Sequence, residues 1–178
     1  MPKPYFNSKC SYNIAEILRV NHAGETAAQI IYAMQLKNLA KSDIAATLKE
    51  MHDQELQHLA FYSEYLKKYN VSPSFMLPLW RVLSASLGFA TSLTPTLAMI
   101  CTKAVEEVID EHYKEQYDRI KDLDSYDQLL LSKIAEHLAD EIHHKQIAID
   151  YLGPFQYPCT ELFIKLSCKL AIYISKKI

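Results

Sequence analysis

Apolar residues recur at spacings of three and four along most of the chain, which is the period of an amphipathic α-helix. The chain contains 3 glycines, and no stretch competes as a β-strand. The sequence therefore predicts an all-α fold. Four long helices are expected at about residues 11–40, 42–68, 95–120 and 126–152, with a shorter last helix at about 160–175.

Local signals place the ends of these helices. Ser42 or Asp43 is expected to cap the second helix, and Pro95 to start the third in the first-turn position that proline favours. Lys121–Ser125 reads as a polar turn, and Gly153, followed by proline, as a strong stop. The helix pairs at 11–68 and 95–152 form an internal repeat in their glutamate and histidine pattern, though hardly in other residues.

Gly24 interrupts the first helical pattern. A glycine inside a helix costs about 1 kcal/mol relative to alanine. Its position beside Glu25 suggests a place where a neighbouring backbone or a substrate comes close to the helix. The alternative is a tolerated defect.

The stretch from Tyr69 to Thr102 carries a single charged residue, Arg81. Prolines and Gly88 break it, whereas a membrane-spanning helix needs about 20 predominantly apolar residues. We expect the stretch to lie at a membrane surface or to cover the bundle, because Trp80 beside Arg81 is typical of an interface. A buried connection between two helix pairs is the alternative. The last helix is expected to bind a membrane surface or to cap the bundle.

Length and composition favour a single domain over residues 1–178, because 178 residues with 49% hydrophobic content can form one substantial core. The formal net charge of -2 and a pI near 6.4 provide no general basic field. Nucleic acid is therefore not an expected partner.

The cysteines contain no Cys-x-x-Cys pair, so neither a disulfide framework nor a zinc ribbon is expected. They are Cys10, Cys101, Cys159 and Cys168. The segment Met1–Cys10 lacks the arginine- and serine-rich character of a transit peptide. These features predict a bacterial cytoplasmic protein or a mature organellar chain.

Candidate metal chemistry comes from a repeated pattern of glutamate and histidine. Two of the long helices carry Glu-x-x-His, which places both side chains on one helix face, and the helix before each carries a single glutamate. The residues are Glu25, Glu55 with His58, Glu106, and Glu141 with His144. One such pair usually marks a solvated face, but the complete series is the ligand pattern of ferritin-like di-iron and di-manganese bundles.

Charge counting agrees with a two-metal site, because four carboxylates neutralise two divalent ions and two neutral imidazoles complete the set. Carboxylates and imidazoles suit iron or manganese better than a metal that prefers thiolates. Zinc is disfavoured.

For other polar residues near these motifs, the sequence leaves more than one role possible. Helical spacing alone does not choose between Glu106 and Glu107 as the ligand. His112 and Tyr113 are candidate catalytic residues that deliver protons or electrons or contact substrate, and ordinary helix packing is the alternative. His22, three residues before Glu25, is either a partner of that ligand or a structural or surface histidine.

The remaining histidines are not expected as metal ligands. They are His52, His137 and His143.

Four stretches together resemble the demethoxyubiquinone hydroxylase family of ubiquinone biosynthesis. They are Asn21–Glu25, Asp53–His58, Cys101–Glu107 and Asp140–His144, and the similarity runs from about Ile17 to Ile178. The resemblance implies a ferritin-like four-helix bundle with extra membrane-associating and C-terminal helices. It also implies that the first glutamate of the Glu106–Glu107 pair is the ligand.

The resemblance further implies a monooxygenase that hydroxylates the ring of a prenylated benzoquinone or quinol with dioxygen. Its cofactors would be two iron ions, with an external reductant that is either a nicotinamide such as NADH or an electron-transfer protein. The chain has no glycine-rich dinucleotide fingerprint of its own. Expected partners are a membrane surface, other proteins of ubiquinone biosynthesis and a second copy of the chain. The expected location is the cytoplasmic face of a bacterial inner membrane, or alternatively the matrix side of the mitochondrial inner membrane.

Three rival functions remain for this pattern. A ferritin-like iron-storage protein would oxidise iron without an organic substrate, a manganese catalase would release oxygen from peroxide, and a quinone-binding subunit would show no turnover. Metal analysis together with product identification separates them.

Overall fold

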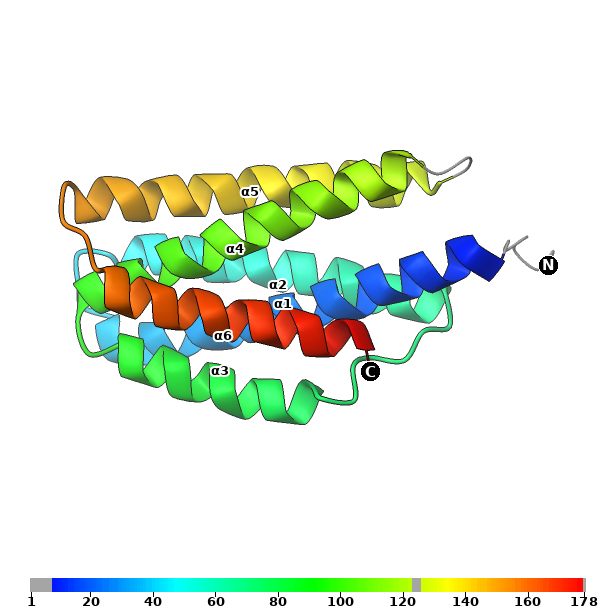
Figure 1. Ribbon diagram of the computed structural model, residues 1–178. Helices are drawn as coiled ribbons and strands as arrows, with labels where there is room; N and C mark the ends of the chain where they lie inside the picture. The colour runs from blue at the N-terminus through cyan, green and yellow to red at the C-terminus, as the bar shows by residue number, and fades with distance from the viewer. Residues whose placement is uncertain (1–7, 123–125, 178) are drawn as a thin grey trace.

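The computed structural model describes residues 8–122 and 126–177, which form six α-helices and no β-strand (Figure 1). The helices are α1 Ser8–Leu39, α2 Ala45–Lys68, α3 Leu77–Thr91, α4 Pro95–Lys121, α5 Gln128–Leu152 and α6 Pro158–Lys177. The predicted all-α fold is confirmed. Residues 1–7, from the segment considered for targeting, and 123–125 of the predicted turn lie outside the described residues.

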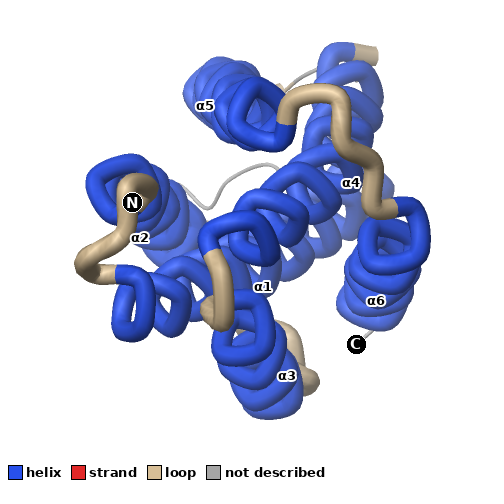
Figure 2. Tube along the Cα trace, turned by 90° about the vertical axis from the view of Figure 1, so that its left-hand side faces the viewer, coloured by secondary structure: helices blue, strands red, loops and turns tan. Residues whose placement is uncertain are grey.

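The bundle is built from two helix pairs, α1 with α2 and α4 with α5 (Figures 1 and 2). Helix α3 packs along the outside of α1, and α6 packs on α4 and α1. This arrangement agrees with the predicted ferritin-like bundle, in which two additional helices cover one side. The single-glutamate helices α1 and α4 carry these additional helices, so the centre of the bundle is shielded on that side.

Most predicted helix boundaries agree with the structure. Pro95 opens α4, where the Thr94 side chain accepts a hydrogen bond from a backbone N–H of the first turn. Gly153 ends α5 with a positive φ of 59°, a conformation that glycine adopts without strain. The predicted cap of α2 is wrong: Ile44 occupies that position without a side-chain hydrogen bond. Ser42 instead donates its hydroxyl to a carbonyl at the end of α1.

The two glycines inside helices have opposite surroundings. A Cβ atom on Gly24 would meet nothing within 4 Å, so no neighbouring backbone approaches α1 there. At Gly88 a Cβ would lie 2.8 Å from the carbonyl oxygen of Ile31 and 2.9 Å from its Cα. The close approach that the sequence suggested for Gly24 therefore occurs at Gly88, where α3 packs against α1.

Two apolar clusters lie on either side of the polar centre of the bundle. One includes Ile17 and Leu18 near the start of α1, together with Ile134 of α5. The other includes Leu39 at the end of α1 and Leu48 of α2. Because Glu25 lies between these positions on α1, the polar side chains of the bundle are enclosed at both ends by apolar packing.

Helices α3 and α6 expose large apolar side chains. Those of the α3 region are Phe75, Leu79, Val82, Leu83, Phe89 and Leu93, and those of α6 are Leu162, Phe163, Leu166, Leu170 and Tyr173. We call these residues the α3–α6 apolar surface. Among the described residues, no helix is long and apolar enough to cross a membrane.

Trp80 does not belong to this surface. The residue is 8% exposed and packs with Leu77 and Ala23, and its Nε1 donates to Ser175 Oγ of α6 at 3.0 Å. The interpretation of Trp80 with Arg81 as an interfacial pair is therefore wrong for the tryptophan, because the inward face of α3 buries it against α1 and α6.

Candidate metal centre

The six side chains predicted as metal ligands converge in the middle of the bundle, and every one of them is buried. Their potential ligand atoms form two groups, within each of which all atoms lie within 4.8 Å of one another. The groups are Glu25, Glu55, His58 and Glu141, and Glu55, Glu106, Glu141 and His144. The four helices that carry these residues thus bring the four sequence motifs together.

Glu55 and Glu141 belong to both groups. They come from the two Glu-x-x-His helices, α2 and α5, whereas Glu25 and Glu106 lie on α1 and α4 and belong to one group each. This arrangement suits two neighbouring ions that share two carboxylates. Each ion would have one further carboxylate and one imidazole.

The two imidazoles face the carboxylates with the same nitrogen. His58 Nδ1 lies 3.4 Å from an oxygen of Glu141 and 3.8 Å from one of Glu55. His144 Nδ1 lies 3.3 Å from Glu141 and 3.4 Å from Glu55. Each Nε2 points away from the centre and contacts a polar side chain of the opposite helix.

These outward contacts fix the imidazole rings. His58 Nε2 lies 3.1 Å from Asp140 Oδ2, and His144 Nε2 lies 2.7 Å from Gln54 Oε1. Because carboxylate and amide oxygens only accept hydrogen bonds, a neutral ring carries its proton on Nε2. The lone pair of Nδ1 then faces the centre, which is the orientation that a metal ligand requires.

Within the described part of the chain, five inward-facing atoms have no hydrogen-bond partners. They are both oxygens of Glu55, Oε2 of Glu141, and Nδ1 of His58 and His144. Buried polar atoms are almost always paired, and donor atoms about 2.1 Å from one ion at right angles lie about 3 Å apart. Spacings of 3.3 to 3.8 Å among these nitrogens and oxygens therefore fit metal ions as the missing partners.

Four carboxylates buried together need a compensating positive charge. Burial, and next the charge of Glu141, raises the pKa of Glu55 and of Glu106 well above the usual value. Burial opposes protonation of His58, but Glu141 and Glu25 outweigh it and raise the pKa of His58 to about 11. Binding of divalent metal ions would therefore displace protons from these groups.

Two tyrosines hold the unshared carboxylates. The hydroxyl of Tyr113 on α4 donates to Glu25 on α1, and the hydroxyl of Tyr32 on α1 donates to Glu106 on α4 at 2.9 Å. Each hydrogen bond crosses between the halves of the bundle and orients one carboxylate toward the centre.

The two candidate ligands at the end of the third motif, Glu106 and Glu107, point in different directions. Glu106 is buried in the centre, whereas Glu107 is half-exposed and pairs with Lys165 of α6 at 2.7 Å. Helical geometry therefore directs the first glutamate of the pair inward and the second toward α6, as the family resemblance implied.

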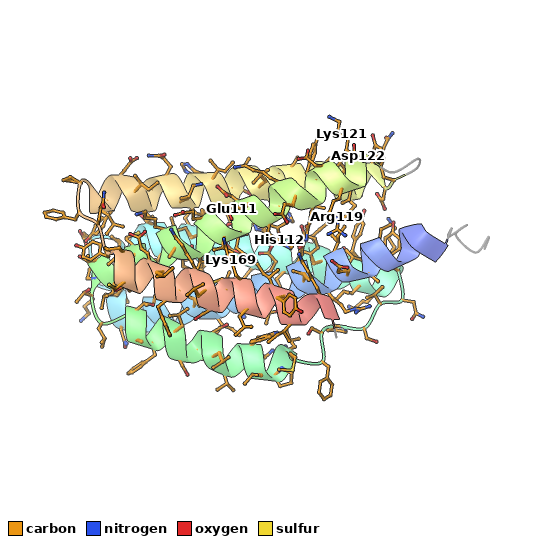
Figure 3. The ribbon with its side chains drawn as sticks, in the orientation of Figure 1. Glu111, His112, Arg119, Lys121, Asp122 and Lys169 are labelled. Carbon is orange, nitrogen blue, oxygen red and sulfur yellow. The ribbon has the colours of Figure 1, made fainter. Side chains whose placement is uncertain are left out.

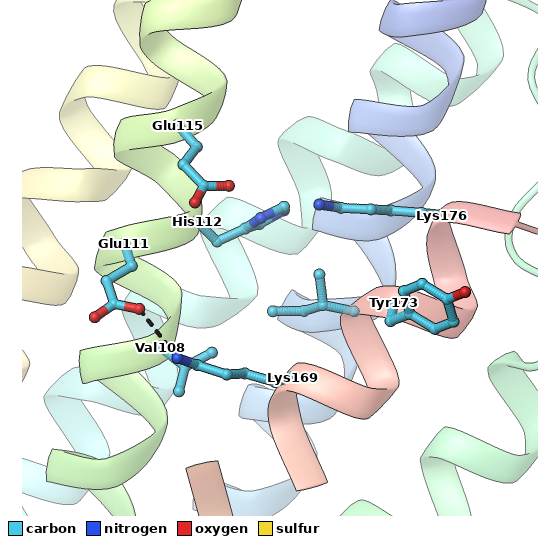
Figure 4. Close-up of a pocket in the computed structure, with 8 residues that line it drawn as sticks. Val108, Glu111, His112, Glu115, Lys169, Tyr173 and Lys176 are labelled. Carbon is cyan, nitrogen blue, oxygen red and sulfur yellow. Dashed lines mark hydrogen bonds and ion pairs between the residues drawn. The ribbon is translucent and has the colours of Figure 1, made fainter. Parts of the chain in front are cut away.

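His112 lies away from the metal centre, although its neighbour Tyr113 contacts Glu25. It lines a pocket of about 230 Å³ between α4 and α6, and Figure 3 shows it beside Glu111 and Lys169. In Figure 4 the imidazole points toward Lys176 of α6.

The inner side of His112 is hydrogen-bonded into the bundle. Its Nε2 lies 2.7 Å from Nε2 of Gln116, and the side-chain amides of Gln116 and Asn21 exchange two hydrogen bonds of 2.7 and 2.8 Å. Burial, followed by the charges of Lys176 and Arg119, lowers the pKa of His112 to about 4. The imidazole is therefore neutral at pH 7.

The other histidines occupy different environments. His137 is buried, stacks on the His58 ring with a centroid distance of 3.9 Å, and lies close enough to Glu25 to form a third potential metal group. Burial, and next the charge of His58, lowers its pKa to about 4. His22 is buried with its Nδ1 unpaired, and His143 is exposed.

Several residues around the centre were given no role in the sequence analysis. They are Tyr32, Gln54, Tyr62, Asp140 and the amide pair of Asn21 and Gln116. The role of Tyr32 could have been inferred from the sequence, because Tyr32 follows Glu25 at the same distance as Tyr113 follows Glu106. The partners of the imidazoles, Gln54 and Asp140, each immediately precede a shared glutamate, but their contacts depend on how α2 and α5 pack together.

The chain is similar to a known protein family over most of its length. Residues 12–175 match the family model described as ubiquinone biosynthesis protein COQ7. A human relative named NADPH-dependent 3-demethoxyubiquinone 3-hydroxylase, mitochondrial, is 36% identical over 171 residues, covering 93% of this chain and 78% of the relative. The Rhodospirillum rubrum 3-demethoxyubiquinol 3-hydroxylase is 37% identical with the same coverage. The yeast 5-demethoxyubiquinone hydroxylase, mitochondrial, is 33% identical, covering 91% and 77%.

Proposed function

The chain belongs to the ubiquinone biosynthesis protein COQ7 family, and from this we propose that it hydroxylates the ring of a demethoxylated ubiquinone precursor. It is a hydroxylase of ubiquinone biosynthesis, as the names of its bacterial and mitochondrial relatives indicate. The observation that carries the proposal is the pair of buried ligand groups sharing Glu55 and Glu141. Fold alone would leave the chemistry open.

We propose that the centre holds two iron ions. The ligands are the six buried side chains Glu25, Glu55, His58, Glu106, Glu141 and His144. When bound, paired iron supplies the redox chemistry by which dioxygen is activated. The unpaired atoms that face the centre support a bound metal, and its mixture of carboxylates and imidazoles favours iron or manganese over zinc.

The chain itself contributes orientation and exclusion of water. Asp140 and Gln54 hold the imidazoles, and Tyr113 and Tyr32 hold the unshared carboxylates. The apolar clusters on either side enclose the centre. A rigid, dry site of this kind keeps the charged groups in position during the reaction.

The proposed reaction needs an external source of electrons. Replacing a ring hydrogen by hydroxyl consumes one dioxygen, two electrons and two protons, and releases one water. We propose a reduced nicotinamide as the electron donor; the human relative is named for NADPH, and NADH is the alternative. Tyr113 is the candidate for proton or electron transfer next to the centre, because it contacts Glu25, and His112 is the candidate at the α4–α6 pocket.

We also propose that the protein binds reversibly to a membrane, where a prenylated quinone resides. The α3–α6 apolar surface supports this, because both helices expose several large apolar side chains and exposed apolar patches often mark membrane interaction sites. The expected location is the cytoplasmic face of a bacterial inner membrane or the matrix side of the mitochondrial one. Self-association and binding to other proteins of ubiquinone biosynthesis stay predictions.

Metal analysis and product identification test the function together. Purified protein reconstituted with ferrous iron should contain two iron ions per chain and convert a short-chain demethoxylated quinone into a product heavier by one oxygen atom. Glu141→Ala should lose both metal and conversion, because it removes a shared ligand. Iron oxidation without quinone conversion would favour a ferritin-like protein, and oxygen release from peroxide a manganese catalase. Quinone binding without turnover would favour a non-catalytic subunit.

A further inference from the structure

The two imidazoles of the centre are held by chemically different groups. His58 Nε2 contacts a carboxylate oxygen of Asp140, whereas His144 Nε2 contacts an amide oxygen of Gln54. Both partners immediately precede the shared glutamate of their helix, so they occupy equivalent positions in the two halves. One half therefore has a carboxylate where the other has a neutral amide.

This difference changes how strongly each imidazole donates to a metal. Hydrogen bonds to an ionised acceptor are roughly twice as strong as those between neutral groups. A carboxylate behind a metal-bound histidine also raises the basicity of the ligand. Nδ1 of His58 should therefore be the stronger donor, and Nδ1 of His144 the weaker one.

The next layer of side chains differs between the halves as well. His137 stacks on His58 and hydrogen-bonds to the Tyr62 hydroxyl at 3.2 Å. The equivalent positions of the other half are occupied by Met51 and Ala148, which belong to an apolar cluster. The surroundings of the His58 position are thus polar, and a polar environment stabilises an ion better than an apolar one.

We propose that the two metal positions are unequal, and that the position formed by Glu25 and His58 binds a divalent ion more tightly than the position formed by Glu106 and His144. The centre therefore fills in a fixed order. This inference rests on the paired metal centre of the proposed function, and it assigns Asp140 as the residue that sets the order by positioning His58.

Calorimetric titration of the metal-free protein with manganese(II) tests the inference without any turnover. The wild-type protein should bind two ions in two resolved steps. Asp140→Asn should weaken the first step by about 10- to 100-fold, because it replaces the carboxylate by an amide of nearly equal shape. The reciprocal Gln54→Glu should instead strengthen the second step.

Controls separate a folding defect from a change in the centre. The Asp140 side chain is 34% exposed, so an amide is sterically tolerated there, and Gln54→Glu provides an independent test if Asp140→Asn does not fold. Asp150→Asn makes the same chemical change at an exposed site of α5 and should leave both steps unchanged.

The outcomes distinguish this inference from the proposed function. Two ions binding with equal affinity, or an unchanged first step in folded Asp140→Asn, would overturn the ordered filling but leave the paired centre intact. An absence of any metal binding by the wild-type protein would overturn both.

Discussion

Tyr32 and Tyr113 make reciprocal hydrogen bonds across the bundle: each donates its hydroxyl to the unshared carboxylate of the other half. Tyr32 of α1 contacts Glu106, and Tyr113 of α4 contacts Glu25. Each tyrosine lies seven residues after the glutamate of its own helix, which is two helical turns. The two-fold pattern of the ligands therefore extends to the groups that orient them.

Replacing either tyrosine should weaken the metal centre. A hydrogen bond to a charged group contributes about 1.5–3 kcal/mol, and loss of such a support typically lowers metal affinity by about 10- to 100-fold. We expect Tyr113→Phe and Tyr32→Phe to raise the metal dissociation constant by at least about tenfold, measured by titration of the metal-free protein. Tyr151→Phe, at a more exposed site of α5, is the matched control. Wild-type affinity in both centre variants would contradict the orienting role.

The two helical glycines should respond oppositely to alanine. Gly88→Ala brings a Cβ against the backbone of Ile31, and overpacking typically costs about 1–3 kcal/mol. Gly24→Ala meets open space and removes the helix penalty of glycine, so it should add up to about 1 kcal/mol. Urea unfolding of the metal-free proteins measures both changes. The expected order would be refuted if Gly88→Ala proved as stable as Gly24→Ala.

His112 should contribute a measurable pH dependence to stability. Its pKa is lowered from 6.5 to about 4 in the folded protein, so the unfolded chain binds more protons between these values. The free energy of unfolding should fall as the pH is lowered through this window, by about 1 kcal/mol per pH unit from this residue.

The variant His112→Gln isolates this contribution, because glutamine does not titrate. The charged residues facing the imidazole, Glu111, Glu115, Lys169 and Lys176, remain in place. Denaturant unfolding of the metal-free proteins at pH 7, 5.5 and 4.5 should give a shallower dependence for the variant. Equal slopes for the variant and the wild type would show that His112 is not held neutral by the fold.

Membrane binding should depend on the α3–α6 apolar surface. We expect wild-type protein to sediment with liposomes and to be released by alkaline carbonate. Introducing charge at Phe89 and Leu166, as Phe89→Asp with Leu166→Asp, should reduce sedimentation severalfold, because both side chains are exposed and apolar. Leu129→Asp, on α5 across the bundle from α3 (Figure 1), is the control. Undiminished sedimentation of the double variant would remove this surface as the binding site.

The helices could be predicted from the sequence because they follow from periodic spacing along the chain, and the convergence of the six side chains because the same glutamate and histidine pattern occurs in both halves. Glu55 and His58, for example, share a face of α2 whatever the tertiary structure. Their partners across the bundle are different, since the contact between His58 and Asp140 depends on the register of α2 against α5. No single-helix pattern encodes that register.

The errors in the sequence predictions have a similar origin. Trp80 beside Arg81 reads as an interfacial pair, yet the inward face of α3 buries the tryptophan against Ser175 of the last helix. Ser42 has the chemistry of an N-cap, but its hydroxyl is already bonded to the end of α1. In both cases a tertiary or neighbouring contact took precedence over the local preference.

The most direct test of the central claim is to follow isotopically labelled dioxygen through the reaction. The iron-loaded protein would be supplied with a short-chain demethoxylated quinone and NADH or NADPH, and the product analysed by mass spectrometry. The account predicts one labelled oxygen atom in the ring with wild-type protein, and none with Glu141→Ala. Oxidised iron or dismutated peroxide with no labelled quinone, for either nicotinamide and several quinone analogues, would contradict it.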